Sequence, residues 1–304
     1  MRTLTPLSRV VGRAGGGEGA MSLRRQYHHS TLTVRSREFA WGARTYLMAI
    51  INVTPDSFSG DGTDSDIDAA VALARAFEAA GADMLDIGGE STRPDAQPLS
   101  PEEEARRVVP AIRAIRAATA LPISVDTMHA VVAEAAFDGG ADMLNDVSGL
   151  RAEPAIAALA ARHGAPVVAM HNQRGRDFDD VIVDIRAGFE ESLAVARDAG
   201  VPGEHIILDP GFGFGWKPEQ NLEMVRRLPE LWDLGYPILI GPSRKSTLGF
   251  VTGEPVDQRV AATASAVALC IAGGADIVRV HDVREMRDVA LIADGIVRDN
   301  WRSP

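Results

Sequence analysis

Eight short apolar segments recur along the chain, and polar residues follow each of them directly. The segments are Tyr46–Val53, Ala82–Ile87, Leu121–Val125, Ala141–Leu144, Ala165–Met170, His205–Leu208, Pro237–Ile240 and Ala275–Val280. Continuous apolar segments of this length are typical of parallel strands that are buried on both faces. Eight of them, separated by segments with helical periodicity, predict a single (β/α)₈ TIM barrel, whose functional site is built by the loops that follow the strands.

The segments between the predicted strands carry helix signals. Ser100-Pro101-Glu102-Glu103 has the pattern of a capping box with proline at the first helical position, which predicts a helix to about Ala118. Further helices are expected near residues 128–138, 153–163, 180–199, 218–234, 256–272 and 284–298. A Gly-Ala-Asp pattern at Gly81, Gly140 and Gly274 is typical of a helix C-cap followed by a strand, so it is expected at the opposite end of the barrel from the functional loops.

The length of 304 residues fits one barrel of about 250 residues with an N-terminal extension. Residues 1–44 are rich in Arg, Ser and Gly and poor in acids, so they are expected to be flexible, or to precede a true start at Met21. A transit peptide has a similar composition. Residues 45–304 are then the barrel domain.

Charge and composition exclude some classes of function. The net charge of −11 argues against a nucleic-acid partner, which would need a basic face. The sequence has no apolar run of the ~18 residues that a membrane span needs. The single cysteine, Cys270, cannot form a disulfide within the chain, which is compatible with a reducing compartment such as the cytoplasm.

Four motifs follow the predicted strands, and together they are specific. They are Asn52–Ser59, Gly88–Pro94, Leu208–Gly215, and Ser243–Lys245 paired with Arg279–Asp282. In this order and spacing they resemble the dihydropteroate synthase family of pterin-binding enzymes, over about residues 46–298. Ser124–Thr127 and Leu144–Asp146 add to the resemblance. It implies a transferase of folate synthesis that joins 6-hydroxymethyl-7,8-dihydropterin pyrophosphate to p-aminobenzoate and releases pyrophosphate.

The resemblance implies that Asp126, Asn145, Asp209 and Lys245 form the pterin pocket. The chemistry of these side chains agrees with that role. A pterin edge presents N–H donors beside nitrogen and oxygen acceptors, so two carboxylates can accept from it while an amide and an ammonium group satisfy the remaining positions.

The resemblance places the pyrophosphate on Asn52, Arg279 and His281, with Asn52 also offering an oxygen to Mg²⁺. Arginine binds phosphate oxygens through a planar fork. Because side chains alternate along a strand, Arg279 and His281 share one face and Val280 lies on the other. The resemblance implies that the catalytic residues are Asp126, Asp209, Lys245, Arg279 and His281.

For p-aminobenzoate the resemblance implies Thr92, Arg93 and Pro94 in the second loop, with Phe214 against the ring and Ser246 at a helix N-terminus near the carboxylate.

The first loop, with Asp56, Ser57 and Phe58, is expected to close over the reaction and exclude water. This matters because the implied mechanism is a dissociative, magnesium-assisted substitution through a pterin-stabilised cation.

Three positions depart from the family's usual pattern. Asp61 is displaced by one residue, Asp95 stands where glycine is usual, and Trp216 separates Gly215 from Lys217. These departures put the loop roles and a functional Lys217 in doubt. His171, just after the fifth predicted strand, could be either a core-lining donor or a catalytic group.

Two alternatives remain open from the sequence. A methyltetrahydrofolate-binding domain of a corrinoid methyltransferase would share the fold and the pterin but would have no pyrophosphate to bind, so Ser243–Lys245 and Arg279–His281 favour the synthase. A non-catalytic pterin-binding protein is the other alternative. The resemblance also implies a homodimer formed by the late helices, and the apolar segment Val260–Ala272 is weak independent support.

Overall fold

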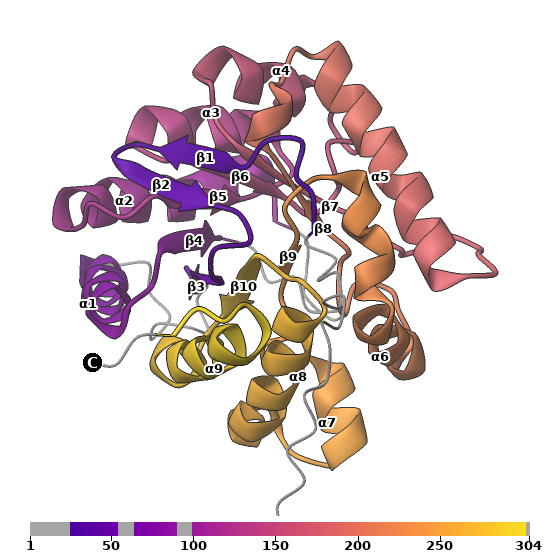
Figure 1. The fold of residues 1–304 in the computed structure, drawn as a ribbon. Helices are drawn as coiled ribbons and strands as arrows, with labels where there is room; N and C mark the ends of the chain where they lie inside the picture. The colour runs from indigo at the N-terminus through magenta and orange to yellow at the C-terminus, as the bar shows by residue number, and fades with distance from the viewer. Residues whose placement is uncertain (1–24, 54–63, 90–98, 302–304) are drawn as a thin grey trace, which may run out of the picture.

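A computed structural model of the chain describes residues 25–53, 64–89 and 99–301. Residues 1–24, 54–63, 90–98 and 302–304, and the side chains of residues 64–66, lie outside the described part. Parallel strands form the centre of the molecule and helices surround them (Figure 1). The single (β/α)₈ barrel that the sequence predicts is confirmed.

Each apolar segment noted in the sequence overlaps one strand of the barrel. The strands are β3 (Tyr46–Asn52), β4 (Met84–Gly88), β5 (Ile123–Asp126), β6 (Met143–Asp146), β7 (Val167–Met170), β8 (Ile206–Asp209), β9 (Leu239–Ile240) and β10 (Ile277–Val280). They pair in the order β8-β7-β6-β5-β4-β3-β10-β9. A parallel bridge joins Leu208 to Ile238, beside a 3.0 Å hydrogen bond from Leu208 N to Pro237 O. It connects β8 and β9, the two ends of this order, and so closes the barrel.

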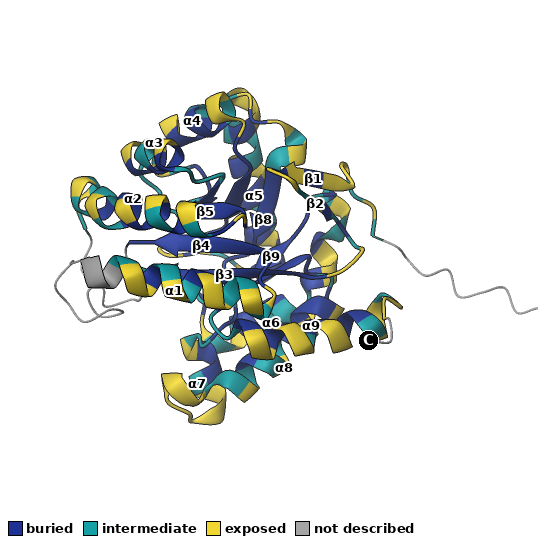
Figure 2. Ribbon diagram, turned by 90° about the vertical axis from the view of Figure 1, so that its left-hand side faces the viewer, coloured by how far each residue is buried: buried dark blue, intermediate teal, exposed yellow. Residues whose placement is uncertain are grey.

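Helices follow the strands and cover the barrel. They are α1 (Asp64–Ala80), α2 (Pro101–Ala118), α3 (Ala130–Gly139), α4 (Ala155–His163), α5 (Val181–Asp198), α6 (Pro218–Arg226), α7 (Ser246–Thr252), α8 (Val260–Ala272) and α9 (Val283–Val297). Figure 2 shows the strands of the barrel buried and the exposed residues on the outer faces of the helices. Across the described ranges, no helix has both the length and the apolar character needed to cross a membrane.

Local chemistry sets the ends of these helices. Ser100 caps α2, because its Oγ accepts a hydrogen bond from Glu103 N at 3.2 Å, as the sequence predicts. The helix expected over 218–234 is in fact two elements, α6 and a 3₁₀ helix at Leu228–Leu234. Pro229 explains the interruption, since it lacks an N–H and disfavours the α conformation of the residue before it.

Side chains along the strands alternate between two hydrophobic clusters. The cluster inside the barrel contains Tyr46, Met48, Met84, Met143, Val168, Ile207, Leu239 and Ile277. Their sequence neighbours, such as Leu47, Leu85 and Leu144, lie in the cluster shared with the helices. Because the side-chain period of a strand is two, a residue two positions beyond an inward-facing residue also faces the interior.

A hairpin precedes the barrel. Its strands, β1 (Thr31–Val34) and β2 (Arg37–Ala40), are antiparallel (Figure 1). Leu32, Val34 and Phe39 are buried in the same cluster as the inward-facing residues of the barrel. The expectation of a flexible extension over residues 1–44 is therefore wrong for the hairpin, because its apolar side chains cover the N-terminal ends of the strands. Residues 1–24 lie outside the described part.

The hairpin end of the barrel also holds the three Gly-Ala-Asp motifs. The glycines of these motifs, Gly81, Gly140 and Gly274, have φ values of 98°, 106° and 91°. This left-handed conformation suits glycine at a helix C-cap. Each aspartate accepts a hydrogen bond from a backbone N–H near the start of a neighbouring strand. The pairs are Leu47 N to Asp83 (2.9 Å), Ile123 N to Asp142 (2.9 Å) and Ile238 N to Asp276 (2.9 Å). The motifs thus have a structural role away from the functional loops, as expected.

Candidate active site

Polar side chains replace the apolar ones at the C-terminal end of the barrel interior. Four polar residues lie two positions beyond inward-facing apolar residues. They are Asp86 after Met84, Asn145 after Met143, Asp209 after Ile207 and Arg279 after Ile277. Asp126 is in register with Asn145 on the neighbouring strand. Strand periodicity therefore brings three carboxylates, an amide and a guanidinium group to one end of the barrel.

Arg279 lies at the centre of this group. Its Nε donates to Asp86 Oδ2 at 2.5 Å, and its Nη2 donates to Asp126 Oδ2 at 2.7 Å. The side chain of Asp86 is fully buried and that of Arg279 is 16 % exposed. One guanidinium group therefore offsets the charge of two carboxylates that have little contact with water.

Asp86 also fixes the amide of Asn145. Asn145 Nδ2 donates to Asp86 Oδ2 at 2.9 Å, which leaves the amide oxygen able to accept from a ligand. Asp86 Oδ1 has no hydrogen-bond partner among the described residues. Asp86 is not among the site residues expected from the sequence. Its position two residues after Met84 was the signal that could have identified it.

The loop after β8 folds back tightly against Asp209. Asp209 Oδ1 accepts a hydrogen bond from Gly211 N at 2.8 Å. Gly211 has a φ of 76°, and a Cβ at this position would lie 2.0 Å from the carbonyl oxygen of His171. The glycine-rich motif is therefore required by close backbone packing, which orients Asp209.

Lys245 precedes the first residue of α7, and its charge interacts with those of Asp209 and Asp126. Its Nζ lies 4.1 Å from the centre of the Phe214 ring, within range of a cation–π interaction. A Cβ on Gly213 would lie 2.9 Å from Lys245 Cδ, so the loop backbone lies directly against the lysine chain. The structure thus brings together all four residues expected to form the pterin pocket.

Burial changes the acidity of these groups. It raises the pKa of Asp126 to about 7, against the opposing effect of Arg279, and raises the pKa of Asp209 to about 6, against the hydrogen bond from Gly211. Burial and the charge of Arg279 lower the pKa of Lys245 to about 8. Three groups that titrate between about 6 and 8 in one cluster are typical of a functional site.

His281 lies next to Ser243, where the two segments of the fourth motif meet. His281 Nδ1 lies 3.0 Å from Ser243 Oγ, and the same hydroxyl oxygen accepts from His281 N at 3.2 Å. Burial and the charge of Arg279 lower the pKa of His281 to about 4. The imidazole is therefore neutral near pH 7 in the absence of ligands, and acts as a hydrogen-bonding group.

Arg244 holds the loop between Ser243 and α7. It adopts a φ of 55°, and its guanidinium group forms two hydrogen bonds with the carboxylate of Asp282, one of them from Nε at 3.0 Å. Its backbone N–H donates to Thr263 Oγ1 at 3.1 Å. Through these contacts Arg244 fixes the backbone next to Lys245.

The structure answers two questions that the sequence left open. His171 is fully buried, and its Nε2 lies 2.8 Å from Asp184 Oδ2, so this histidine lines the core and the catalytic alternative is not supported. Trp216 is also buried and packs beside His171, with ring centres 5.7 Å apart. This departure from the family pattern therefore fills the core, and Lys217 is exposed at the start of α6.

The remaining site predictions are described only in part. Asn52 is the last residue of β3, and Ser246 is exposed as the first residue of α7. Within the described ranges, no three His, Cys, Asp or Glu side chains are grouped so as to hold a metal ion. The other predicted residues lie outside the described part. They are Asp56, Ser57, Phe58, Asp61, Thr92, Arg93, Pro94 and Asp95.

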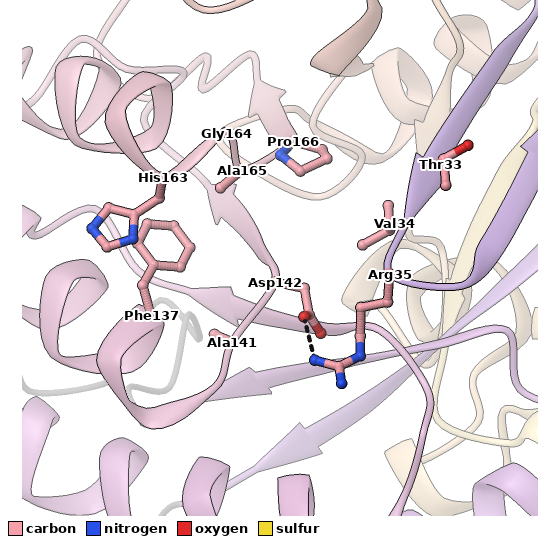
Figure 3. A pocket seen from close by; sticks show the side chains of 10 residues that line it. All are labelled: Thr33, Val34, Arg35, Phe137, Ala141, Asp142, His163, Gly164, Ala165 and Pro166. Atoms are coloured by element: carbon pink, nitrogen blue, oxygen red, sulfur yellow. Dashed lines mark hydrogen bonds and ion pairs between the residues drawn. The ribbon is translucent and has the colours of Figure 1, made fainter.

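A hollow lies near the hairpin end of the barrel, opposite the candidate active site (Figure 3). Its lining includes Arg35 from the hairpin, which forms an ion pair with Asp142 at 3.1 Å. Phe137 stacks on His163 at its other side, with ring centres 4.9 Å apart. The hollow adjoins the structural Gly-Ala-Asp motif at residue 142, so we separate it from the candidate active site.

Comparisons with known proteins agree with this geometry. Residues 48–281 match the pterin binding enzyme family. A dihydropteroate synthase of Synechocystis sp. is 45 % identical over 284 residues, which cover 91 % of this chain and 97 % of the relative.

Solved structures give the same result. A dihydropteroate synthase from Clostridium difficile, determined in the presence of pteroic acid, superimposes with a TM-score of 0.83 at 46 % identity, covering 85 % of this chain and 98 % of the other. The Xanthomonas albilineans dihydropteroate synthase with 4-aminobenzoic acid has a TM-score of 0.83 at 42 % identity, covering 88 % and 98 %. The chain therefore belongs to the dihydropteroate synthases, the transferases of folate synthesis within the pterin-binding enzyme family.

Proposed function

We propose that the polar end of the barrel interior binds the pterin ring of 6-hydroxymethyl-7,8-dihydropterin pyrophosphate. Asp126 and Asp209 would accept hydrogen bonds from the ring N–H and amino groups, Asn145 would accept through its amide oxygen, and Lys245 would donate. The observation that carries this proposal is the convergence of these four side chains, from separate strands and loops, around Arg279.

Arg279 and His281 would bind the pyrophosphate. The guanidinium group offers a planar fork to phosphate oxygens, and the neutral imidazole adds a hydrogen bond. In the absence of ligands, Arg279 is engaged with Asp86 and Asp126. A pterin donor on Asp126 would replace the Nη2 contact and free that end of Arg279 for the pyrophosphate.

Asn52 would contribute to a magnesium site. It ends β3 at the functional end of the barrel and carries a hard amide oxygen. Magnesium sites often use one or two protein oxygens, with water and substrate phosphates as the other ligands, so this donor fits the ion. Bound there, Mg²⁺ would offset the charge of the leaving pyrophosphate.

The proposed reaction is a dissociative substitution. The bond between the pterin methylene carbon and the pyrophosphate oxygen breaks, and its electron pair leaves with pyrophosphate. The pterin stabilises the methylene cation, the neutral amine of p-aminobenzoate attacks the carbon, and the surplus amine proton passes to solvent or pyrophosphate. Arg279 and His281 stabilise the negative charge that develops on the leaving group. No side-chain nucleophile is needed.

The p-aminobenzoate site is proposed beside the pterin. Phe214 is buried next to Lys245, where its ring would contact the aromatic ring of the substrate. The N–H groups around Ser246 would meet the carboxylate. The roles of Thr92, Arg93 and Pro94, and of Asp56, Ser57 and Phe58 in excluding water, stay predictions from the sequence.

Pyrophosphate release tests the proposed reaction. Purified protein is mixed with the pterin pyrophosphate, p-aminobenzoate and Mg²⁺, and the same assay is run without each component. Release that requires all three and falls at least about a hundredfold in Asp209→Asn and Lys245→Ala would support the proposal. Release that proceeds equally without p-aminobenzoate, or in both variants, would contradict it.

We also propose that the protein is a homodimer with a cytoplasmic location, the latter in keeping with the reduced, buried Cys270. An apolar groove between α6, α7 and α8 supports the dimer. Leu222 and Leu269, which line it, are 48 % and 62 % exposed, and Phe250 on α7 is 75 % exposed. Apolar side chains in such a continuous surface are typical of protein interfaces.

Sedimentation velocity tests the dimer. A charge at the groove in Leu269→Glu is expected to give a monomer, because burying an unpaired carboxylate is costly. Val131→Glu is the matched control, since Val131 is 54 % exposed on α3, away from the groove. A wild-type monomer at micromolar concentration, or a dimer in Leu269→Glu, would contradict this interface.

A further inference from the structure

Asn221 is a buried amide on α6 that no sequence motif singled out. Its side chain is inaccessible to solvent, and it makes hydrogen bonds through both of its polar atoms. Asn221 Oδ1 accepts from Gly213 N at 2.7 Å, and Nδ2 donates to Thr247 Oγ1 at 2.9 Å. Nδ2 also lies 3.3 Å from Trp216 O and 3.2 Å from Lys217 O.

These contacts join two segments that are far apart in sequence. Gly213 belongs to the loop that follows Asp209, whereas Thr247 lies in the first turn of α7, two residues after Lys245. Thr247 is almost fully buried, so its hydroxyl has little access to water as an alternative partner. Asn221 therefore links the loop that carries one half of the proposed pterin pocket to the helix start that carries the other half.

The linked segments touch each other at the pocket. The backbone of Gly213 lies against the aliphatic part of Lys245, where a Cβ would come within 2.9 Å of Lys245 Cδ. The next residue, Phe214, places its ring 4.1 Å from Lys245 Nζ. A shift of the Gly213 backbone would therefore move both the surface along which Lys245 runs and the ring beneath its ammonium group.

We propose that Asn221 is a positioning residue that holds the loop after β8 and the start of α7 together, so that Asp209 and Lys245 face the same ligand. This rests on the proposed assignment of Asp209 and Lys245 to the pterin. Asparagine suits the position because an amide offers an acceptor and two donors. An aspartate would place a carboxylate against the carbonyl oxygens of Trp216 and Lys217, which need a donor.

The test compares Asn221→Ala and Thr247→Val with wild type in steady-state assays that vary each substrate in turn. Thr247→Val preserves shape and removes the hydroxyl, so it provides a second variant if Asn221→Ala folds poorly. The KM for the pterin pyrophosphate is expected to rise about tenfold in Asn221→Ala and less in Thr247→Val, because buried hydrogen bonds are lost. The KM for p-aminobenzoate should also rise, because Phe214 and the start of α7 are proposed to contact that substrate, whereas the far-UV circular dichroism should change little.

A double-mutant cycle separates positioning from general stabilisation. If Asn221 acts through Lys245, then adding Asn221→Ala to Lys245→Ala should raise the pterin KM by less than about threefold, because coupled residues are not additive. An additional tenfold rise in that background would overturn the proposal. So would a fall in melting temperature with both KM values unchanged. If Lys245→Ala alone leaves the pterin KM unchanged, then the pocket assignment fails before the role of Asn221 is reached.

The pH profile provides a further check. Lys245 has its pKa lowered to about 8 by burial and by Arg279, with Asp209 and Asp126 acting in the opposite direction. Loosening the loop in Asn221→Ala would hydrate Lys245 and move the alkaline limb of kcat/KM to higher pH. An alkaline limb identical to that of wild type would count against the proposal.

Discussion

Arg279 Nη2 donates a hydrogen bond to Asp126 Oδ2 over 2.7 Å, at the end of the barrel where the polar residues converge. The family resemblance gives these two residues different ligands, the pyrophosphate for Arg279 and the pterin for Asp126. Their contact in the absence of ligands means that binding at one residue changes the freedom of the other. We therefore expect binding of the pterin at Asp126 to favour binding of the pyrophosphate of the same substrate at Arg279.

Asp86→Asn tests the anchor of this arrangement. Asp86 holds Arg279 at 2.5 Å and Asn145 at 2.9 Å, and its replacement by an uncharged group of equal size weakens both contacts. We expect kcat/KM for the pterin pyrophosphate to fall at least about tenfold. The matched control is Asp142→Asn at the opposite end of the barrel, which should leave kcat/KM unchanged. Both variants are measured by steady-state kinetics. An equal loss of activity in Asp86→Asn and Asp142→Asn would refute the role of Asp86 in orienting Arg279 and Asn145.

The pH dependence of kcat/KM follows from the buried cluster. The pKa values of about 6 for Asp209 and about 7 for Asp126 predict activity that rises as pH increases through these two values, as both carboxylates ionise to accept from the pterin. The pKa of about 8 for Lys245 predicts a fall above that value.

A variant of His281 tests which group produces the acid limb, which is the rise of kcat/KM with increasing pH. Its pKa of about 4 places its titration below the limb. His281→Ala should therefore be less active but retain the limb, whereas Asp209→Asn should shift it. Loss of the limb in His281→Ala would show that the histidine, and neither carboxylate, controls it.

The same burial makes Asp209 a cost to stability at neutral pH. Its carboxyl has an ordinary pKa of 3.8 and a folded-state pKa of about 6. Between these values the folded protein keeps the proton that the unfolded chain has lost, so the free energy of unfolding falls as pH rises. The cost above pH 6 is on the order of 3 kcal/mol. Asp209→Asn should therefore flatten the pH dependence of urea unfolding between pH 4 and 6, and an unchanged slope would contradict this.

Asp276 stabilises the hairpin end of the barrel through its contacts. This fully buried carboxylate accepts from Arg25 at 2.9 Å and from Tyr27 at 2.6 Å, and it also caps the backbone at Ile238. Asp276→Ala leaves the buried Arg25 guanidinium group without its carboxylate partner, which should cost about 3–5 kcal/mol of unfolding free energy in urea denaturation. Asp198→Asn, in an exposed pair with Arg197, should cost less than about 1 kcal/mol. Comparable losses in the two variants would contradict the account.

The sequence was sufficient for the barrel because buried parallel strands have a direct signature. The same periodicity places Asp126, Asn145, Asp209 and Arg279 on one inner surface, so the convergence of the candidate site could also be predicted. These residues lie in the last two positions of short apolar strands, so their direction follows from the strand alone.

Other features depend on contacts that no local pattern records. Asp86 contacts Asn145 and Arg279, which lie 59 and 193 residues away in sequence. Asn221 joins Gly213 and Thr247, which lie 8 and 26 residues away. The hairpin at 31–40 is only four residues per strand, too short for its alternation to stand out from the Arg- and Ser-rich sequence around it. His171 could not be assigned until its partner Asp184 was located on α5.

The central claim is that Asp126, Asn145, Asp209 and Lys245 bind the pterin. The most direct measurement is the pair of KM values in Asp209→Asn, each determined at saturating concentration of the other substrate. We predict that the KM for the pterin pyrophosphate rises at least about tenfold while that for p-aminobenzoate stays within about twofold, because only the pterin donors lose a charged acceptor. A raised KM for p-aminobenzoate with an unchanged KM for the pterin would contradict the account.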